Sequence, residues 1–324
     1  MAIVYVIVAF WGDRANTRIA EAFGRTHCAG DSSIFQRQFA MCGAGDHNAS
    51  GRRALLLKES SYTFKFYASG RRYCEGCLAT LMLRCRPDLM SWALQLFVPD
   101  EDLLELEVYM NEAVMPTTVL AIGTPRQAKA LSSRADVGSF AKPVKPNSGS
   151  IPPGADFPNK KLQVLAEHSG LFTELLTDPR VAEVFSNPAH LRLFRSLLVT
   201  SDASGPNRRL LRLVLAMPGE GDMKALGPLL AMLPALIDIV GTYKLSPEHK
   251  KRAQEARAKA EAASTDAEEL RKRRLEALQQ RKIEKALEEK MRLARMDPEA
   301  RRKAEEKLAA KAAKKSIRMK MVRQ

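Results

Sequence analysis

The chain has 324 residues, a formal net charge of +15 and 27% charged residues. Residues 241–324, about a quarter of the chain, hold 26 basic and 14 acidic residues and so carry 12 of the net +15, which excludes a uniformly basic protein. The five cysteines are odd in number and irregularly spaced, which argues against a secreted disulfide scaffold and indicates a reducing compartment.

Residues 1–11 are apolar and carry no charge. A membrane-spanning helix needs about 20 such residues, and the basic segment and cleavage site of a signal peptide are absent here. Three interpretations stay open: a buried strand, an interfacial anchor, or the C-terminal half of a transmembrane helix. Phe10 and Trp11, followed by Arg14 and Arg18, are typical of an interfacial aromatic pair with a positive cytoplasmic flank. The candidate membrane contacts are Val4, Val6, Ile7, Val8, Phe10 and Trp11.

Residues 12–59 are predicted to form a juxtamembrane helix, over residues 12–25, and a loop rich in Gly, Asp, Asn and Ser. Residues 60–243 are predicted to form an α+β globular domain with a mixed or antiparallel sheet and packed helices. Alternating aromatic residues from Tyr62 and the turn at residues 69–72 predict a hairpin over residues 60–84.

The rest of this domain is predicted to contain both helices and strands. Helices are predicted at residues 87–97, 125–131 and 178–185, and strands at residues 103–110, 117–122, 191–200 and 210–217. Residues 141–159 contain five prolines and two glycines and predict a loop. Residues 223–240 are almost continuously apolar, but Pro228, Pro234 and Asp238 favour a core helix over a membrane span.

No catalytic constellation is evident in the sequence. Cys74 and Cys77 form a single Cys-x-x-Cys pair without a second ligand pair at zinc-site spacing, so buried thiols are preferred to a zinc or redox site. The five histidines are scattered, and the segment at residues 123–129 lacks the second glycine of a phosphate-binding loop. We therefore expect no enzyme activity, no cofactor and no small-molecule substrate.

Residues 244–324 contain no aromatic residue and favour a long basic helical arm that starts at Pro247 and runs to about Met296. Asp297 and Pro298 are predicted to break the helix and to start a second one. The apolar positions form a loose heptad seam typical of a weak coiled coil. That seam consists of Leu270, Leu275, Leu278, Ile283, Leu287, Met291 and Ala294.

Basic residues dominate two segments of the arm, residues 271–274 and 307–323. A solvated helix with mixed charges does not account for these two segments. RNA phosphate, anionic lipid and an acidic protein are the candidate partners, and ribosomal RNA suits an arm that has no aromatic residues for base stacking. The candidate contacts are Arg271, Lys272, Arg273, Arg274, Lys307, Lys311, Lys314, Lys315, Arg318, Lys320 and Arg323.

Several segments in order resemble one known family. The most specific are Ser69-Gly70-Arg71 with Cys74-Glu75-Gly76, and the helix start Pro87-Asp88-Leu89. Others are Met110-Asn-Glu112, Ala121-Ile-Gly-Thr124, Ser201-Asp202 with Gly205-Pro206, Asp297-Pro-Glu299 and the ending Lys314 to Met321. From about Ala15 to the C-terminus the chain resembles calumin, the coiled-coil-domain-containing subunit of the PAT (protein associated with translocon) complex.

The resemblance implies a single-pass protein of the endoplasmic reticulum membrane, with a cytosolic globular domain and a C-terminal coiled coil. It implies work beside the Sec translocon channel and the ribosome, with an Asterix-like small membrane partner, on nascent multipass membrane proteins. Residues 1–11 would then be the remainder of a transmembrane helix that is cut short. The family is also linked to calcium binding and calcium homeostasis, but its lumenal acidic region has no counterpart in these residues.

Two functions from different classes follow. The first is a non-enzymatic membrane-protein biogenesis factor at the ribosome–translocon junction. The alternative is a soluble RNA-binding or ribosome-binding coiled-coil protein without a membrane role, in which residues 1–11 form a core strand.

Overall fold

The computed structural model describes residues 2–29, 33–43, 56–94, 97, 100–144, 151–152, 157–158 and 161–294. The chain divides into two compact units, Met1–Ala256 and Arg257–Gln324. We call the first unit the body and the second the arm, and each is described by itself.

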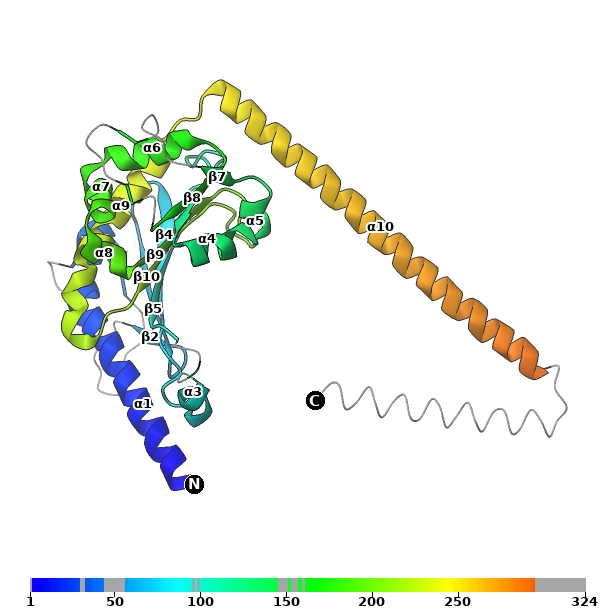
Figure 1. Cartoon of the computed structure of the whole chain (residues 1–324), viewed down its shortest axis with the longest axis horizontal. Coiled ribbons are helices and arrows are strands. Elements are labelled where there is room, and N and C mark those ends of the chain that lie inside the picture. The colour runs from blue at the N-terminus through cyan, green and yellow to red at the C-terminus, as the bar shows by residue number, and fades with distance from the viewer. Residues whose placement is uncertain are drawn as a thin grey trace. The chain divides into compact units, whose positions relative to one another are not determined.

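The body is built on a ten-stranded sheet in which every strand pair is antiparallel (Figure 1). The predicted α+β class is confirmed, and of the two sheet types expected the antiparallel one is present. The strands are β1 (Met41–Cys42), β2 (Leu57–Lys58), β3 (Thr63–Ser69), β4 (Cys74–Met82), β5 (Leu103–Met110), β6 (Val119–Gly123), β7 (Lys142–Val144), β8 (Gln163–Ala166), β9 (Phe194–Thr200) and β10 (Leu210–Ala216).

The strand order is β1-β3-β4-β5-β10-β9-β6-β8-β7, with β2 paired to β3. The hairpin of β9 and β10 therefore lies between β5 and β6, which are neighbours in the sequence. Apolar and acidic residues alternate along β5, and this alternation assigns them to the two faces of the sheet. Leu104, Leu106 and Val108 are fully buried on one face. Glu105 and Glu107 point to the other face. The predicted hairpin at residues 60–84 is confirmed as β3 and β4.

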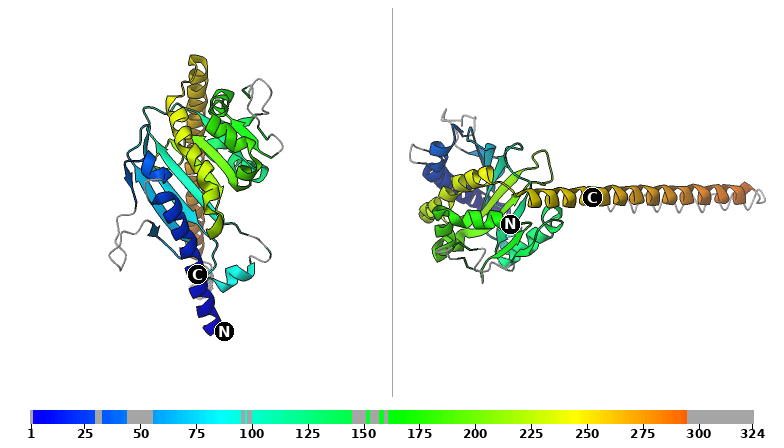
Figure 2. Two further views of the ribbon diagram at one scale, coloured as in Figure 1. Left: turned by 90° about the vertical axis from the view of Figure 1, so that its left-hand side faces the viewer. Right: turned by 90° about the horizontal axis from the view of Figure 1, so that it is seen from above.

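Helices cover one face of the sheet and part of the other. Figure 2 shows α1 and α9 crossing the same face, and the main core lies between that face and its helices. A smaller core, which includes Val119, Leu131 and Val137, lies under α4 and α5 on the opposite face. The helices of the body are α1 (Ala2–Phe23), followed by a π-helical turn (Gly24–Cys28), α2 (Ile34–Gln38), α3 (Leu89–Leu94), α4 (Pro125–Ser132), α5 (Ala135–Gly138), α6 (Ser169–Thr177), α7 (Pro179–Ser186), α8 (Pro188–Leu193) and α9 (Gly227–Thr242), which follows a 3-10 helix (Glu220–Leu226).

Helix α9 is the central core helix, as predicted for residues 223–240. Leu229, Leu230, Leu233 and Leu236 are at most 1% exposed. Among the described residues, the segment Glu220–Thr242 is long and apolar enough to cross a membrane, but 61% of its most apolar window is buried inside the body. Its apolar surface is therefore accounted for by packing against the sheet.

Three expectations about the elements are corrected by the structure. Residues 2–11 belong to helix α1, so the strand interpretation of residues 1–11 is wrong. The segment at residues 141–159 includes the edge strand β7, where a proline is tolerated because its nitrogen has no ladder bond to make. The strand expected from residue 191 begins at Phe194, because Asn187 caps and Pro188 starts the short helix α8.

One predicted helix differs in extent from the structure, and the short helices α2, α5 and α8 were not predicted. The helix expected over residues 87–97 is the short α3, and α6 was not predicted at all. The side chains expected on the buried face of α3 lie outside the described residues. Helix α6 has nine residues, which is too short to give a clear helical period in the sequence.

Helix α10 (Pro247–Ala294) begins in the body and continues through the described part of the arm, with 48 residues in all. At 1.5 Å per residue this corresponds to roughly 72 Å. The seam residues Leu275, Leu278, Ile283 and Met291 are 51–66% exposed. The predicted break at Asp297 and Pro298, and the helix after it, lie outside the described residues.

Candidate functional site

Helix α1 is divided into an exposed apolar half and a packed half. Five large side chains in its first half are 50–66% exposed: Tyr5, Val6, Ile7, Phe10 and Trp11. In the second half Asn16, Ala20 and Phe23 are at most 1% exposed, and Ala20 and Phe23 join the core. The predicted membrane residues Val6, Ile7, Phe10 and Trp11 thus share one end of α1. Val8 is partly buried there, and the side chain of Val4 lies outside the described set.

A buried polar clamp joins the packed half of α1 to the loop at residues 84–87. The Asn16 amide nitrogen donates to the carbonyl oxygens of Ser61 at 2.9 Å and of Arg84 at 3.1 Å. Its amide oxygen accepts from Arg86 Nη1 at 2.7 Å, and Arg86 Nη2 donates to Asp102 at 2.6 Å. Because Asn16 is fully buried and all these groups are paired, the clamp fixes the direction of α1 relative to the sheet.

The clamp depends on a close approach next to Gly12. A Cβ atom at this position would lie 2.5 Å from the carbonyl carbon of Arg86 and from the nitrogen of Pro87. Since real side chains do not tolerate that distance, only glycine lets the loop lie directly against α1. Both Gly12 and Asn16 were missed in the sequence, and the one available signal was a glycine inside a helical pattern.

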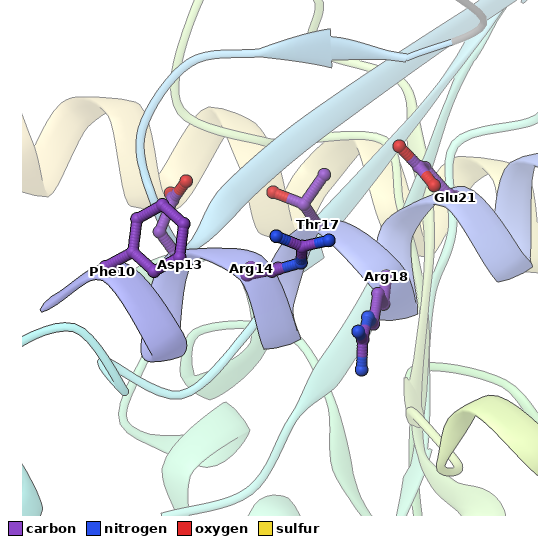
Figure 3. Close-up of a pocket in the computed structure, with 6 residues that line it drawn as sticks. All are labelled: Phe10, Asp13, Arg14, Thr17, Arg18 and Glu21. Atoms are coloured by element: carbon purple, nitrogen blue, oxygen red, sulfur yellow. The ribbon is translucent and has the colours of Figure 1, made fainter. Parts of the chain in front are cut away.

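A shallow hollow follows α1 across the junction between its two halves (Figure 3). Six residues of α1 line it: Phe10, Asp13, Arg14, Thr17, Arg18 and Glu21. Asp13 is paired with Lys58 at 2.6 Å, while Arg14 and Arg18 are exposed one helical turn apart. The positive flank expected from the sequence therefore lies next to Phe10, at the boundary of the apolar half.

The Ser69-Gly-Arg71 motif builds the fold rather than a chemical site. Gly70 and Tyr73 have positive φ angles of 83° and 71°, which turn the chain from β3 into β4. Arg71 Nη2 donates to Asp238 Oδ2 on α9 at 2.7 Å, and its other terminal nitrogen donates to Gln38. The motif thereby fastens the hairpin to α9.

Cys28, Cys74 and Cys77 belong to the main core, and Cys42 is packed against it. Cys28 and Cys77 are fully buried and Cys74 is 8% exposed. Burial raises the pKa of Cys74 to about 11 and also raises the pKa of Cys28 and of Cys77, which keeps these thiols protonated and unreactive. Within the described ranges, no three His, Cys, Asp or Glu side chains are grouped in a way that fits a metal ion.

The opposite face of the sheet carries an acidic pair on β5. Glu105 is 6% exposed and is paired with Arg212 on β10. Burial, and then repulsion from Glu105, raise the pKa of the Glu107 carboxyl, although Arg212 partly offsets this effect. Glu107 in turn accepts a bond from the Tyr109 hydroxyl at 3.3 Å.

The N-terminal end of α10 is packed against the rest of the body. The rings of His168 and His249 are stacked with their centroids 4.4 Å apart and an interplanar angle of 12°. Ala253, one turn further along, is 1% exposed. A hollow beside this end of the helix is lined by basic residues, which include Arg209, Lys244 and Lys250. The part of α10 up to Ala256 therefore belongs to the body.

The described part of the arm presents the first of the two predicted basic clusters. Arg271, Lys272, Arg273 and Arg274 are all exposed on α10. Arg273 is 3.9 Å from Glu269, and this surface pair is weak. The second cluster lies outside the described residues: Lys307, Lys311, Lys314, Lys315, Arg318, Lys320 and Arg323.

Comparison with known proteins gives one consistent family. The family model described as PAT complex subunit CCDC47 matches residues 1–315. The Arabidopsis thaliana protein named "Uncharacterized protein At5g49945" is 35% identical over 262 residues, which are 80% of this chain and 53% of that protein. The human PAT complex subunit CCDC47 is 27% identical over 280 residues, covering 80% of this chain and 56% of that protein. The chain thus spans about half the length of the curated relatives it matches.

A solved structure gives only a weak likeness. The crystal structure of the mycobacterial trehalose monomycolate transport factor A, TtfA, matches with a TM-score of 0.30 and 10% identity. The match covers 72% of this chain and 98% of that one. A score at this level supports no argument about fold or function.

Proposed function

Because the chain belongs to the PAT complex subunit CCDC47 family, we propose that it assists the insertion and folding of multipass membrane proteins at the endoplasmic reticulum. In this proposal it works beside the Sec translocon channel, with the bulk of the chain facing the cytosol. The ribosome, the channel, an Asterix-like small membrane partner and nascent membrane proteins are its partners. The family is one of complex subunits rather than enzymes, so the chain is not an enzyme.

The half-exposed helix α1 is the observation that carries the membrane placement. Soluble proteins seldom expose so many large apolar side chains on consecutive turns of one helix. Here the exposed residues are Tyr5, Val6, Ile7, Phe10 and Trp11. Placed in lipid, the same residues have an apolar surrounding, with the aromatic pair at the interface and Arg14 and Arg18 on the cytosolic side. The clamp at Asn16 then holds the body at a defined angle to the membrane helix.

Alkaline carbonate extraction of the tagged full-length protein from microsomes tests this placement. We expect the protein to remain in the membrane pellet. Release of the protein into the supernatant would reject the membrane role. The alternative function, a soluble RNA-binding coiled-coil protein, would then be the better account of the exposed arm.

We assign the basic cluster at residues 271–274 to phosphate contact on the ribosome. Each neutralised phosphate releases counterions, so log K falls with log salt by roughly 0.7–0.9 per contact. We measure ribosome binding by co-sedimentation at several salt concentrations. Replacing Arg271, Lys272, Arg273 and Arg274 by Gln should reduce the magnitude of the slope of log K against log salt by about 3.

A matched control changes the same number of charges in the mixed-charge part of the arm. Arg281, Lys282, Lys285 and Lys290 lie among acidic residues, so their replacement by Gln should change the slope less. Equal slopes for the two quadruple variants would remove the assigned role of residues 271–274. Deletion of residues 299–324 tests the second cluster in the same assay, and unchanged ribosome binding would reject its role.

A further inference from the structure

The segment that contains helix α3 is apolar, and three of its described side chains are exposed on the body. Residues 89–98 have the sequence LMSWALQLFV, which contains no charged residue. Met90 is 71% exposed, Leu94 is 60% exposed and Phe97 is 84% exposed. We call these three residues the α3 patch. Large side chains with this exposure require a partner, because soluble surfaces seldom gather them on so short a segment.

The α3 patch lies beside the exposed half of α1. Figure 1 and the left view of Figure 2 place α3 next to the N-terminal part of α1, and the two helices are in contact. The loop that leads into α3 is the one in contact with Gly12, and the Asn16–Arg86–Asp102 clamp holds it there. Since Gly12 directly follows Phe10 and Trp11, α3 starts at the level of the aromatic pair on α1.

We propose that the α3 patch is a second membrane contact, which dips into the cytosolic interface of the lipid bilayer beside α1. Because α3 is in contact with α1, its exposed apolar residues lie near the level at which aromatic side chains favour the headgroup boundary. A short uncharged segment that contains Trp, Phe, Leu and Met has the composition of an interfacial element. This inference rests on the proposed membrane placement of α1.

Two membrane contacts constrain the orientation of the body more than a single contact does. A single helix in lipid leaves the body free to swing about that helix, whereas a second contact held by a rigid clamp restricts both tilt and rotation. The body would then present a constant face to whatever lies above the membrane. The α3 patch is thus an orienting contact for the proposed work at a membrane-bound channel.

Depth-dependent quenching of tryptophan emission by brominated phospholipids tests the proposal on the full-length protein in phosphatidylcholine nanodiscs. The chain has two tryptophans, Trp11 and Trp92. The reporter variant combines Phe97→Trp with Trp11→Phe and Trp92→Phe. A second reporter keeps Trp11 alone, by Trp92→Phe. The matched control places Met41→Trp in the background without other tryptophans, because Met41 is 69% exposed at the far end of β3 from the clamp.

We expect the tryptophan at position 97 to be blue-shifted and quenched by bromines near the headgroups, while the one at position 41 is neither. Adding Met90→Glu and Leu94→Glu to the reporter should abolish its quenching. If the emission at position 97 matches that at position 41 while Trp11 is quenched, the α3 contact is refuted and the membrane placement of α1 stands. If Trp11 is not quenched either, the proposed membrane placement itself fails.

Discussion

Replacing Gly12 by Ala tests the close approach between α1 and the loop at residues 84–87. In an unconstrained helix this change would stabilise the protein by about 1 kcal/mol, because glycine is a poor helix former. Here the added Cβ would lie 2.5 Å from backbone atoms of Arg86 and Pro87, which cannot rotate away. The loop must therefore move by about 1 Å to reach an ordinary contact, at an overpacking cost of about 1–3 kcal/mol.

That movement also weakens the clamp one turn further along. Asn16 makes bonds of 3.1 Å and 2.7 Å to this loop, each contributing about 1 kcal/mol. Losing one or two of them brings the net destabilisation of the Gly12→Ala variant to about 1–4 kcal/mol, after the helix propensity gain is subtracted. The sign is opposite to that expected from the sequence alone.

Urea unfolding of the full chain in detergent, followed by maleimide labelling of Cys28 and Cys77, measures the effect. Both thiols are fully buried, so they are labelled only when the body opens. We expect a lower urea midpoint for Gly12→Ala. Gly227→Ala is the matched control, because nothing lies within 4 Å of its added Cβ, and its midpoint should stay or rise. An unchanged or higher midpoint for Gly12→Ala would refute the reasoning about the close approach.

Two further outcomes are expected in the same assay. Arg71→Ala should lower the midpoint by the equivalent of about 1–3 kcal/mol, because it removes the charged bond to Asp238 on α9; no loss would show that the motif does not fasten the hairpin. Glu107→Gln should raise the midpoint at pH 7.5 but not at pH 4. The folded protein holds the Glu107 proton more tightly than the unfolded chain does, so wild-type stability falls as the pH rises above the ordinary value of 4.5. A Gln variant with the wild-type pH profile would contradict the raised pKa.

Local patterns in the sequence were enough to predict most of the body. The hairpin of β3 and β4 follows from alternating aromatic residues around a glycine turn, and α9 follows from its apolar run with prolines. Asp178 and Pro179 mark the start of α7 as a cap and first-turn proline do in general. These features are legible because they depend on residues within a few positions of one another.

The N-terminal segment shows where local patterns are insufficient. An uncharged run of eleven residues is compatible with both a strand and a helix, and only the structure shows that it continues into the packed half of α1. The family motif around Arg71 was visible in the sequence, but its structural role depends on Asp238, which is 167 positions away. Burial of the Cys74 and Cys77 thiols was expected from the sequence and is confirmed, but the elements that bury them come together only in the tertiary structure.

The sequence by itself determined the α+β class, the basic arm and the apolar start of the chain, because composition and period are local properties. Only the tertiary structure decided the direction of α1 relative to the sheet and what lies beside it. That geometry depends on a glycine contact and a buried clamp between residues 16, 61, 84, 86 and 102, which are brought together by the sheet. Contacts between such distant residues leave no periodic signal in a single sequence, and they are the contacts that place α3 beside the proposed membrane helix.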